Sequence, residues 1–178
     1  MERLDVRLRR LRAGDSAMVR GWRNSPRVAA DLITNHTISA EEHEAWLARV
    51  LDADDCRYWI VCLDDRPVGL ASVVDIDRSE KRCRWGFYNA EVELRGRGII
   101  TAALTSVLDQ VFGELGLDLV AAEVLASNAA SLAIHRRLGF EIVEHVPDAV
   151  HRDGRDIDLV LLELTARAWH AGKAIAGD

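Results

Sequence analysis

The chain has 178 residues, of which 49% are hydrophobic and 29% charged, and its formal net charge is −6. This composition is typical of a globular protein with a sizeable core, and the length predicts a single domain over residues 1–178. The acidic balance argues against nucleic acid as the main partner, and no apolar run is long enough to cross a membrane. The N-terminus shows no signal peptide, and three cysteines give neither an even disulfide set nor a metal-ligand spacing. We therefore expect a cytoplasmic protein with reduced thiols and no metal.

The first third of the chain predicts one strand and two helices. Residues 6–11 alternate in part between polar and apolar side chains and are expected to form a strand. Asp15 is predicted to cap a helix that ends before Pro26. Ser39 then opens a second helix with a capping box, and apolar residues at helical spacing continue that helix to Leu51.

Three strands follow. Residues 58–63 and 68–76 are predicted strands on either side of an Asp-Asp-Arg-Pro turn, and a fourth strand covers residues 81–88. The charged cluster at residues 78–84 is interpreted as a solvated hairpin. A helix ending near Phe112 comes next.

The rest of the chain predicts a strand, a short helix and a final hairpin. Residues 117–125 are almost continuously apolar, as is typical of a strand with both faces buried. Ser127 and Asn128 are expected to cap a helix that stops at Gly139. Residues 140–146 and 157–164 form the last two predicted strands, and the tail over residues 165–178 is predicted to be helical.

The stretch from Leu94 to Leu104, LRGRGIITAAL, joins the fourth strand to a helix through a glycine-rich turn. The backbone amides that open a helix are unpaired, and the helix dipole adds positive charge there, so the place suits a pyrophosphate group. Gly96 and Gly98 allow a close approach of the backbone, and Arg95 and Arg97 add charge. The pattern predicts a small phosphate-bearing ligand at this turn.

Three motifs occur in the order and spacing of one known family: Arg95-Gly96-Arg97-Gly98-Ile99, Asn128-Ala-Ala-Ser131 and Leu138-Gly139-Phe140. With them the chain resembles, over essentially its whole length, the GNAT superfamily of acetyl-CoA-dependent N-acetyltransferases. The resemblance implies a mixed α/β fold with helices on both faces of a sheet of about seven strands. It also implies acetyl-CoA as the cofactor, with its pantetheine arm between the splayed fourth and fifth strands.

The same resemblance assigns the cofactor site. It comprises the glycine turn with the start of the following helix, and the start of the later short helix: Arg95, Gly96, Arg97, Gly98, Ile99, Ile100, Thr101, Asn128 and Ser131. Ile100 stands where the family usually has Gly or Ala, so the packing at this point is expected to differ.

Further motifs resemble a narrower group, the N-acetyltransferases of the pseudaminic acid pathway, which acetylate a 4-amino group on a UDP-linked sugar. They include Trp22-Arg23-Asn24, Ile38-Ser39, His43, Trp46-Leu47 and Tyr58-Trp59-Ile60-Val61. This resemblance implies a small-molecule acceptor, a nucleotide-linked amino sugar. Two alternatives stay open: a ribosomal-protein-type N-terminal acetyltransferase and a non-catalytic acyl-CoA-binding domain. A homodimer formed through an exposed strand edge is a further expectation.

Two residues are candidates for proton transfer. Glu123 lies in an apolar strand, where loss of solvent would raise its pKa, and is predicted to act as the base or to relay a proton through water. The alternative is a Glu that faces solvent or pairs with an Arg. His135 lies where the family commonly has a Tyr, on one helix face with Asn128 and Ser131. It is a candidate acid for the departing thiolate, and the alternative is a packing histidine.

The acceptor side is expected on the first two helices. Aromatic rings suit a base or a hexose, and an Arg suits a diphosphate. The candidates are Trp22, Arg23, Asn24, His43 and Trp46. The alternative for the two Trp residues is a place in the core, and for Arg23 a solvated charge.

Overall fold

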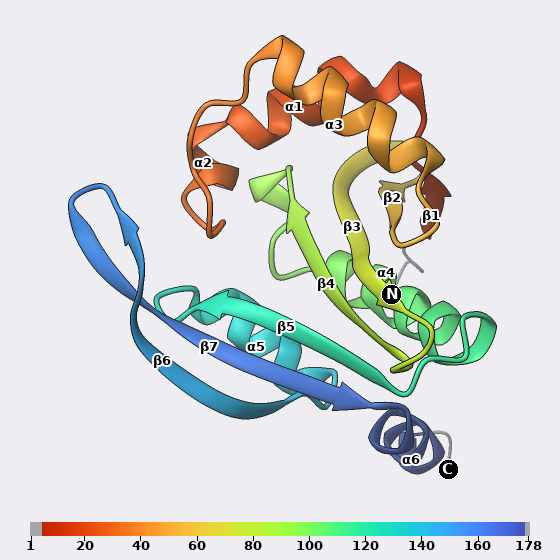
Figure 1. The fold of residues 1–178 in the computed structure, drawn as a ribbon. Coiled ribbons are helices and arrows are strands. Elements are labelled where there is room, and N and C mark those ends of the chain that lie inside the picture. Colours follow the sequence, from red (N-terminus) through yellow and green to blue (C-terminus); the bar gives the residue numbers. More distant parts are fainter. Residues whose placement is uncertain (1–4, 177–178) are drawn as a thin grey trace.

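Seven segments of the chain pair into one mixed sheet in the computed structural model, which describes residues 5–176 (Figure 1). The strands are β1 (Val6–Arg10), β2 (Arg57–Leu63), β3 (Arg66–Asp77), β4 (Arg82–Asn89), β5 (Leu119–Leu125), β6 (Glu141–Arg152) and β7 (Arg155–Thr165). Their order across the sheet is β1-β2-β3-β4-β5-β7-β6. Only β4 and β5 run parallel, and the other neighbouring strands are antiparallel. The predicted mixed sheet of seven strands is confirmed.

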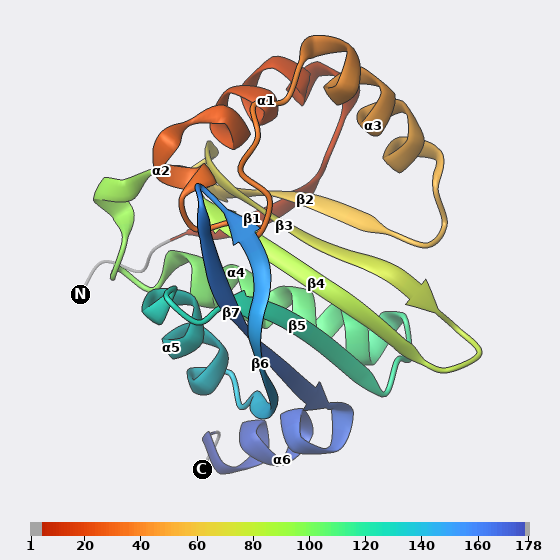
Figure 2. The ribbon, with the colours of Figure 1, turned by 60° about the vertical axis from the view of Figure 1, so that its left-hand side comes forward.

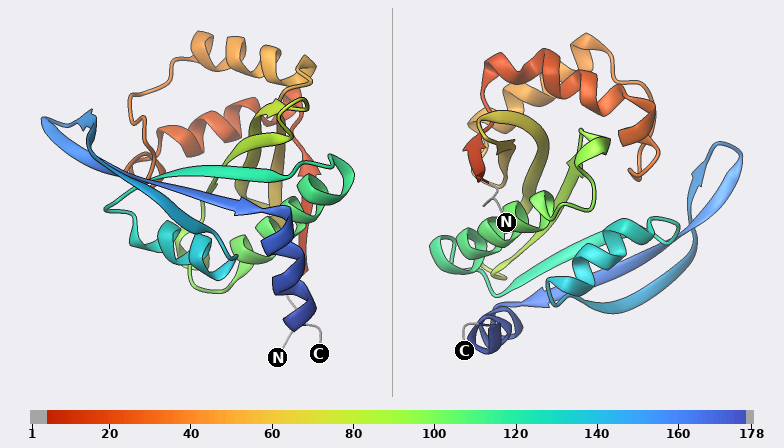
Figure 3. Two further views of the ribbon diagram at one scale, coloured as in Figure 1. Left: turned by 60° about the horizontal axis from the view of Figure 1, so that its bottom comes forward. Right: turned by 180° about the vertical axis from the view of Figure 1, so that it is seen from behind.

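Helices cover both faces of this sheet, as expected (Figure 3). They are α1 (Ser16–Asn24), α2 (Pro26–Ala29), α3 (Ala40–Asp52), α4 (Ile99–Asp109), α5 (Ala129–Arg137) and α6 (Ala166–Ala176). The first three lie over the half of the sheet that holds β1 to β4, and α4 and α5 lie on the opposite face. The predicted tail helix is α6, which follows β7 directly; residues 177 and 178 of the predicted tail lie outside the described part.

Two apolar clusters hold the layers together. The larger joins the sheet to α4, where Leu104 and Leu108 have no exposed surface. The smaller joins the sheet to α1 and α3 through residues such as Val19, Leu47 and Ile60. Each such side chain contributes about 1.5–3 kcal/mol on burial. Because the helices are fixed on both faces, the ends of β4 and β5 are held in a rigid frame.

Three local predictions were wrong. Asp15 does not cap α1, because its carboxylate accepts hydrogen bonds from Arg9 at 2.7 and 2.8 Å and from the Arg12 amide at 2.9 Å. The short helix α2 was missed, although Ser25 caps it and Pro26 begins it, both of which are helix-start signals. The strand over residues 117–125 is not buried on both faces. Its accessible and buried residues alternate from Leu119 to Val124.

The final hairpin is longer than predicted and extends beyond the body of the sheet (Figure 2). The first of these strands was predicted to end at residue 146, but β6 continues past Pro147, and its register against β7 shifts between Val146 and Val150. Asp148 lies within this irregularity with φ at 52°. A shift of this kind leaves a proline outside the ladder of hydrogen bonds, and the strand continues past it. The tip of the hairpin thereby reaches the loop that follows α2.

Candidate active site

The parallel pair β4 and β5 opens into a wedge. Only three residue pairs connect the two strands, and the last of them joins Arg84 to Ala121. From Trp85 to Asn89, β4 keeps β3 on one edge and has no strand partner on the edge toward β5. Backbone amides and carbonyls on such an edge are free to bind an extended ligand. A cavity of about 780 Å³ begins at this wedge and extends beneath α1 and α3.

The glycine turn forms part of the lining of this cavity. Gly96 and Gly98 have φ values of 78° and 79°, in the left-handed region that favours glycine. Gly98 is the residue that caps α4, and the first bond within the helix runs from the Ala102 amide to the Gly98 carbonyl at 2.9 Å. The preceding amides, of Ile99, Ile100 and Thr101, therefore have no acceptor inside the helix. The turn has the geometry expected of an anion site.

Most of the predicted cofactor residues line this cavity. They are Arg95, Gly96, Gly98, Ile99, Ile100, Thr101, Asn128 and Ser131. Arg97 is exposed and is not part of the lining, so its expected contact with the ligand has no support in the structure. Ile100 is buried, with Cδ1 at 3.3 Å from the point that a Cβ on Gly69 would occupy. The larger residue fits at this position because Gly69 leaves room for it.

Asn128 caps α5, as predicted. Its Oδ1 accepts a hydrogen bond from the Ser131 amide at 3.0 Å, and its Nδ2 donates to the Asp31 carbonyl at 3.2 Å. The Asp31 carboxylate in turn accepts a hydrogen bond from Arg95 at 3.0 Å. Asp31 thus connects the loop after α2 to both halves of the predicted cofactor site. Sequence reasoning missed this residue, because no local pattern distinguishes it from a solvated Asp.

The Asp31 carboxylate is paired with the guanidinium of Arg95, the group that is expected to bind the cofactor phosphates. We therefore expect Asp31→Asn to bind CoA more tightly than the wild type. Because both side chains are more than two fifths exposed, the gain should be small, about two- to fivefold in Kd. Titration of CoA by calorimetry measures it. Asp54→Asn is the matched control and should leave Kd unchanged. Weaker binding in Asp31→Asn would mean that the carboxylate orients Arg95 rather than competing for it.

His135 is among the residues that line the cavity, but its imidazole is not free. It is 2% exposed, and both ring nitrogens are engaged. Nδ1 lies 2.8 Å from the Ser131 carbonyl and donates to it, and Nε2 accepts from the Trp85 indole at 3.0 Å. The ring also packs edge-on against Phe140. Burial lowers the pKa of the imidazole, and the bond to Ser131 offsets this only in part. These contacts support the alternative of a packing residue that joins α5 to β4, and the acid role remains an untested prediction.

A consequence of the lowered His135 pKa can be measured as a pH dependence of stability. An unfolded histidine has a pKa near 6.5, so protonation favours the unfolded chain. The stability due to neutral His135 is fully present above about pH 6.5 and is lost as the pH falls toward the folded-state pKa. The amide oxygen of His135→Gln is still able to accept from Trp85. We expect this variant to be less stable than the wild type at neutral pH.

Between about pH 7 and about pH 5, however, His135→Gln should lose less stability than the wild type. Urea unfolding at each pH measures both values. His43, whose pKa burial also lowers, is present in both proteins and cancels in the comparison. An identical loss of stability in the two proteins would contradict this assignment.

Glu123 lies on the acceptor side of the wedge, two residues beyond the last β4–β5 pair. It is not desolvated as expected, since its side chain is 39% exposed and its Oε1 accepts from Arg84 Nη1 at 3.3 Å. Arg84 Nε also donates to Asp75 at 2.6 Å. Arg84 was interpreted as part of a solvated hairpin, but it lines the cavity and connects two carboxylates across the opening. Glu123 thus lines the cavity with a guanidinium beside it, which is the arrangement of the alternative, a Glu paired with an Arg.

The five predicted acceptor residues separate into two groups. Trp22 packs edge-on against Tyr88 and belongs to the smaller core cluster, and it is not part of the cavity lining. Asn24 binds both backbone groups of Ile38, at 2.8 and 2.9 Å, and so fixes the loop before α3. For both residues a structural role accounts for the observed contacts.

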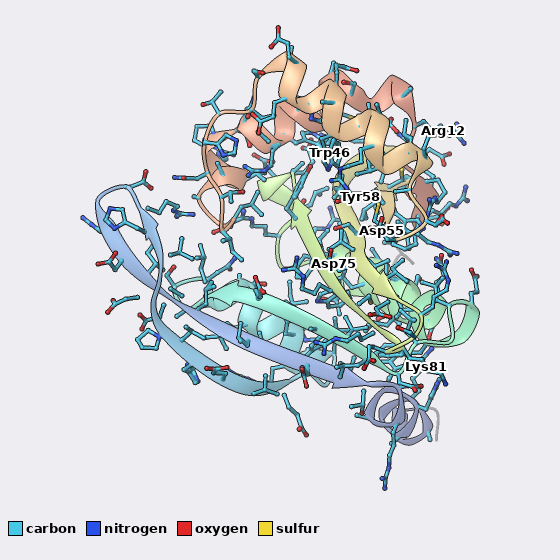
Figure 4. The ribbon with its side chains drawn as sticks, in the orientation of Figure 1. Arg12, Trp46, Asp55, Tyr58, Asp75 and Lys81 are labelled. Atoms are coloured by element: carbon cyan, nitrogen blue, oxygen red, sulfur yellow. The ribbon has the colours of Figure 1, made fainter. Side chains whose placement is uncertain are left out.

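Arg23, His43 and Trp46 form the second group and line the cavity. The Trp46 ring lies tilted against His43, with ring centroids 5.0 Å apart, and meets Tyr58 edge-on at 5.2 Å. Figure 4 shows Trp46 and Tyr58 together below α3, with Asp75 further along toward β5. The upper part of the cavity is thus aromatic, and its lower part is bordered by charged groups. This arrangement suits a ligand with a flat ring and polar substituents.

The hairpin tip binds the loop that forms one wall of the cavity. Arg152 donates hydrogen bonds to the carbonyls of Leu32 and of Ala30, the latter at 2.9 Å. Asn35 donates to Asp153 at 2.9 Å. These contacts hold residues 31–38, most of which line the cavity, against the end of β6. The cavity wall is therefore built from segments more than a hundred residues apart.

The described residues contain neither a metal-binding cluster nor a membrane-spanning helix. Between residues 5 and 176 no three His, Cys, Asp or Glu side chains gather as a metal site would require. Among the helices of that part, none is both long and apolar enough to span a membrane.

Comparison with known proteins supplies a family and several relatives. A family model described as an acetyltransferase (GNAT) domain matches residues 5–141. A putative ribosomal N-acetyltransferase of Bacillus subtilis, YdaF, is 32% identical over 105 residues, which are 59% of this chain and 57% of that protein. The chain thus spans little more than half the length of that relative. The acetyltransferase PseH of Campylobacter jejuni is 27% identical over 130 residues, 73% of this chain and 79% of that protein.

Among solved structures, a spermidine N-acetyltransferase from Vibrio cholerae, in complex with CoA and spermine, is similar with a TM-score of 0.86. The alignment covers 93% of this chain and 98% of that one, at 18% sequence identity. At this identity the similarity concerns the fold alone.

Proposed function

Because the chain belongs to the GNAT acetyltransferase family, we propose that it transfers the acetyl group of acetyl-CoA to the amino group of a nucleotide-linked amino sugar. The proposal of acetyl transfer rests on the open wedge between β4 and β5, which leads directly to the free amides at the start of α4. A phosphate group and an extended chain are the two ligand features that such a site accommodates.

The residues present fit CoA. The left-handed turn at Gly96 and Gly98 lets the backbone approach a pyrophosphate, and the amides of residues 99–101 have no other acceptor in the helix. Arg95 lines the same place and adds a charge. The unpaired edge of β4 offers backbone groups to the pantetheine amides. When bound, acetyl-CoA supplies an acetyl group activated as a thioester.

Glu123 is proposed to accept the proton that the acceptor amine must lose. Its carboxylate lies at the mouth of the wedge on the acceptor face, either in direct contact with the amine or one water away. Arg84 holds this carboxylate in place and is itself anchored by Asp75. The β4 amides that face the wedge are the donors available for negative charge on the carbonyl oxygen.

The choice of a sugar nucleotide as acceptor rests on two observations. The similarity to PseH covers 79% of that protein, and the cavity offers the aromatic rings of Trp46 and Tyr58 for a base or a sugar ring. The alternative is N-terminal acetylation of a protein, which the name of the Bacillus subtilis relative favours. A cytoplasmic location, a single domain and a homodimer remain predictions.

The experiment is release of the CoA thiol from acetyl-CoA in the presence of a panel of amines. The panel holds UDP- and dTDP-linked 3-amino and 4-amino sugars, N-terminal peptides of basic ribosomal proteins, and spermidine. Turnover of one sugar nucleotide with inactive peptides is expected. Turnover of peptides alone would favour the alternative, and CoA binding without turnover of any amine would indicate a non-catalytic binding domain.

A further inference from the structure

Two polar nitrogens in the acceptor half of the cavity have no hydrogen-bond partner among the described residues. They are Nη1 of Arg23 on α1 and Nε2 of His43 on α3, and both side chains line the cavity. Buried polar atoms are rarely left unpaired, and an unpaired atom in a binding site points to a group that the ligand supplies. Among the residues that line this cavity, Arg23 and His43 are the two with such an atom.

We propose that the acceptor carries an anionic group, a phosphate or a carboxylate, which Arg23 binds while His43 contacts a polar group of the same molecule. The inference builds on the proposed function, because it concerns the acceptor side of the same site. It goes further by naming the residues that select the acceptor and the charge that they select.

The surroundings of Arg23 leave its charge unmatched. Its Nη2 donates to the carbonyl and the hydroxyl of Thr34, at 2.5 and 2.7 Å, and both of these acceptors are neutral. Among the described residues no carboxylate lies within ion-pair distance of the guanidinium. Glu42, the acid whose charge acts on Arg23, is bound by His36 at 2.8 Å. An anion in the cavity would supply the missing partner.

The surroundings of His43 add specificity. The side chain is 3% exposed and packs at a tilt against the Trp46 ring. A ring held in this way offers Nε2 in a fixed direction, as specific recognition of a polar group requires. Arg23 and His43 come from different helices that α1–α3 packing brings together. They therefore define a subsite in the part of the cavity that α1 and α3 line.

This subsite discriminates between acceptor classes. A polyamine would bring a second ammonium group next to an unpaired guanidinium, and like charges in a partly enclosed site repel each other. The Vibrio cholerae enzyme has the same fold at 18% sequence identity. Similarity of fold at this level does not imply that this chain accepts the same amine. Amines with a nearby phosphate or carboxylate are expected to bind, and spermidine is not.

The first test measures binding without turnover. With the cofactor site saturated by CoA, UDP serves as the probe and is titrated by calorimetry against the wild type, Arg23→Gln, Arg23→Lys and Arg27→Gln. Arg27 lies on α2, 67% exposed, and is absent from the cavity lining, so its variant is the charge-matched control. We expect Arg23→Gln to weaken UDP binding at least about tenfold, Arg23→Lys to weaken it less, and Arg27→Gln to leave it unchanged. Equal binding by Arg23→Gln and the wild type would overturn the proposal. No binding of UDP to the wild type would contradict the sugar nucleotide as acceptor, and the acceptor pairs of the second test then decide the anion.

The second test uses pairs of acceptors that differ only in the anion: glucosamine 6-phosphate with glucosamine, and leucine with leucinamide. For the pair that turns over, the ratio of the two kcat/KM values should fall at least about tenfold in Arg23→Gln and about threefold in His43→Gln. The ratio within one variant is independent of how much protein is folded. If amino acids react and sugar nucleotides do not, the proposed acceptor is wrong while the anion requirement stands. If a sugar nucleotide reacts with unchanged kcat/KM in Arg23→Gln, the anion inference fails alone.

Discussion

Glu123→Gln is expected to lower kcat at least about a hundredfold, because the amide cannot accept the proton that the attacking amine releases. The side chain keeps its size, and its amide oxygen is still able to accept the hydrogen bond from Arg84, which lies 3.3 Å from the carboxylate. The KM for acetyl-CoA should therefore stay within about twofold of the wild-type value. Steady-state kinetics with the acceptor identified by the panel gives both constants.

Two controls distinguish the loss of a base from a general disturbance of the sheet. Glu141→Gln, an exposed position on β6, should leave kcat unchanged. Arg84→Gln removes the group that holds Glu123 in place, and it should lower kcat by a smaller factor than Glu123→Gln does. A pH–rate profile that is the same in Glu123→Gln and in the wild type would show that the proton goes elsewhere.

Gly69→Ala is expected to have the largest effect on stability, a loss of about 2–3 kcal/mol in the free energy of unfolding. A Cβ on Gly69 would lie 2.5 Å from the backbone oxygen of Tyr88 and 3.3 Å from Ile100 Cδ1. The first atom belongs to the neighbouring strand and cannot rotate away, so β3 and β4 must separate. Urea unfolding followed by circular dichroism measures the change.

Gly21→Ala is the matched control. Gly21 lies inside α1, and nothing approaches its Cβ position within 4 Å. Alanine favours a helix over glycine by about 1 kcal/mol, so this variant should be slightly more stable than the wild type. In Gly69→Ala the displacement of Ile100 should also weaken CoA binding, because Ile100 supplies one of the free amides of α4. A Gly69→Ala protein as stable as the wild type would show that the strands yield at little cost.

Local patterns in the sequence were sufficient for most of the secondary structure. Ser39 at the start of α3, the helix end before Pro26 and the glycine turn before α4 each depend on a few neighbouring residues, and all three occur as predicted. The wedge between β4 and β5 was expected from the resemblance to the family. In the structure it arises because the pairing of these two strands ends at Arg84. Local chemistry and a family pattern were thus sufficient to predict the glycine turn and the wedge, and the cofactor contacts there remain predictions.

Contacts between distant residues could not be inferred in the same way. Arg84 meets Glu123 across 39 positions, and Arg95 meets Asp31 across 64. Each of these residues looks like a solvated charge in its own segment. His135 shows the same limit, since helical spacing placed it beside Asn128 but did not reveal the Trp85 indole that engages it. Which charges and rings the acceptor side uses depends on the assembled sheet.

The order of strands across the sheet has a consequence for the synthesis of the chain. β7 lies between β5 and β6, so the penultimate element of the described chain fills an inner place in the sheet. Arg152, which fixes the loop after α2, is itself made more than a hundred residues after that loop. A nascent chain therefore carries the glycine turn and the acceptor helices well before the wall that joins them. Such late, long-range closure slows folding and leaves strand edges open, so the ribosome-bound intermediate is the form most exposed to aggregation.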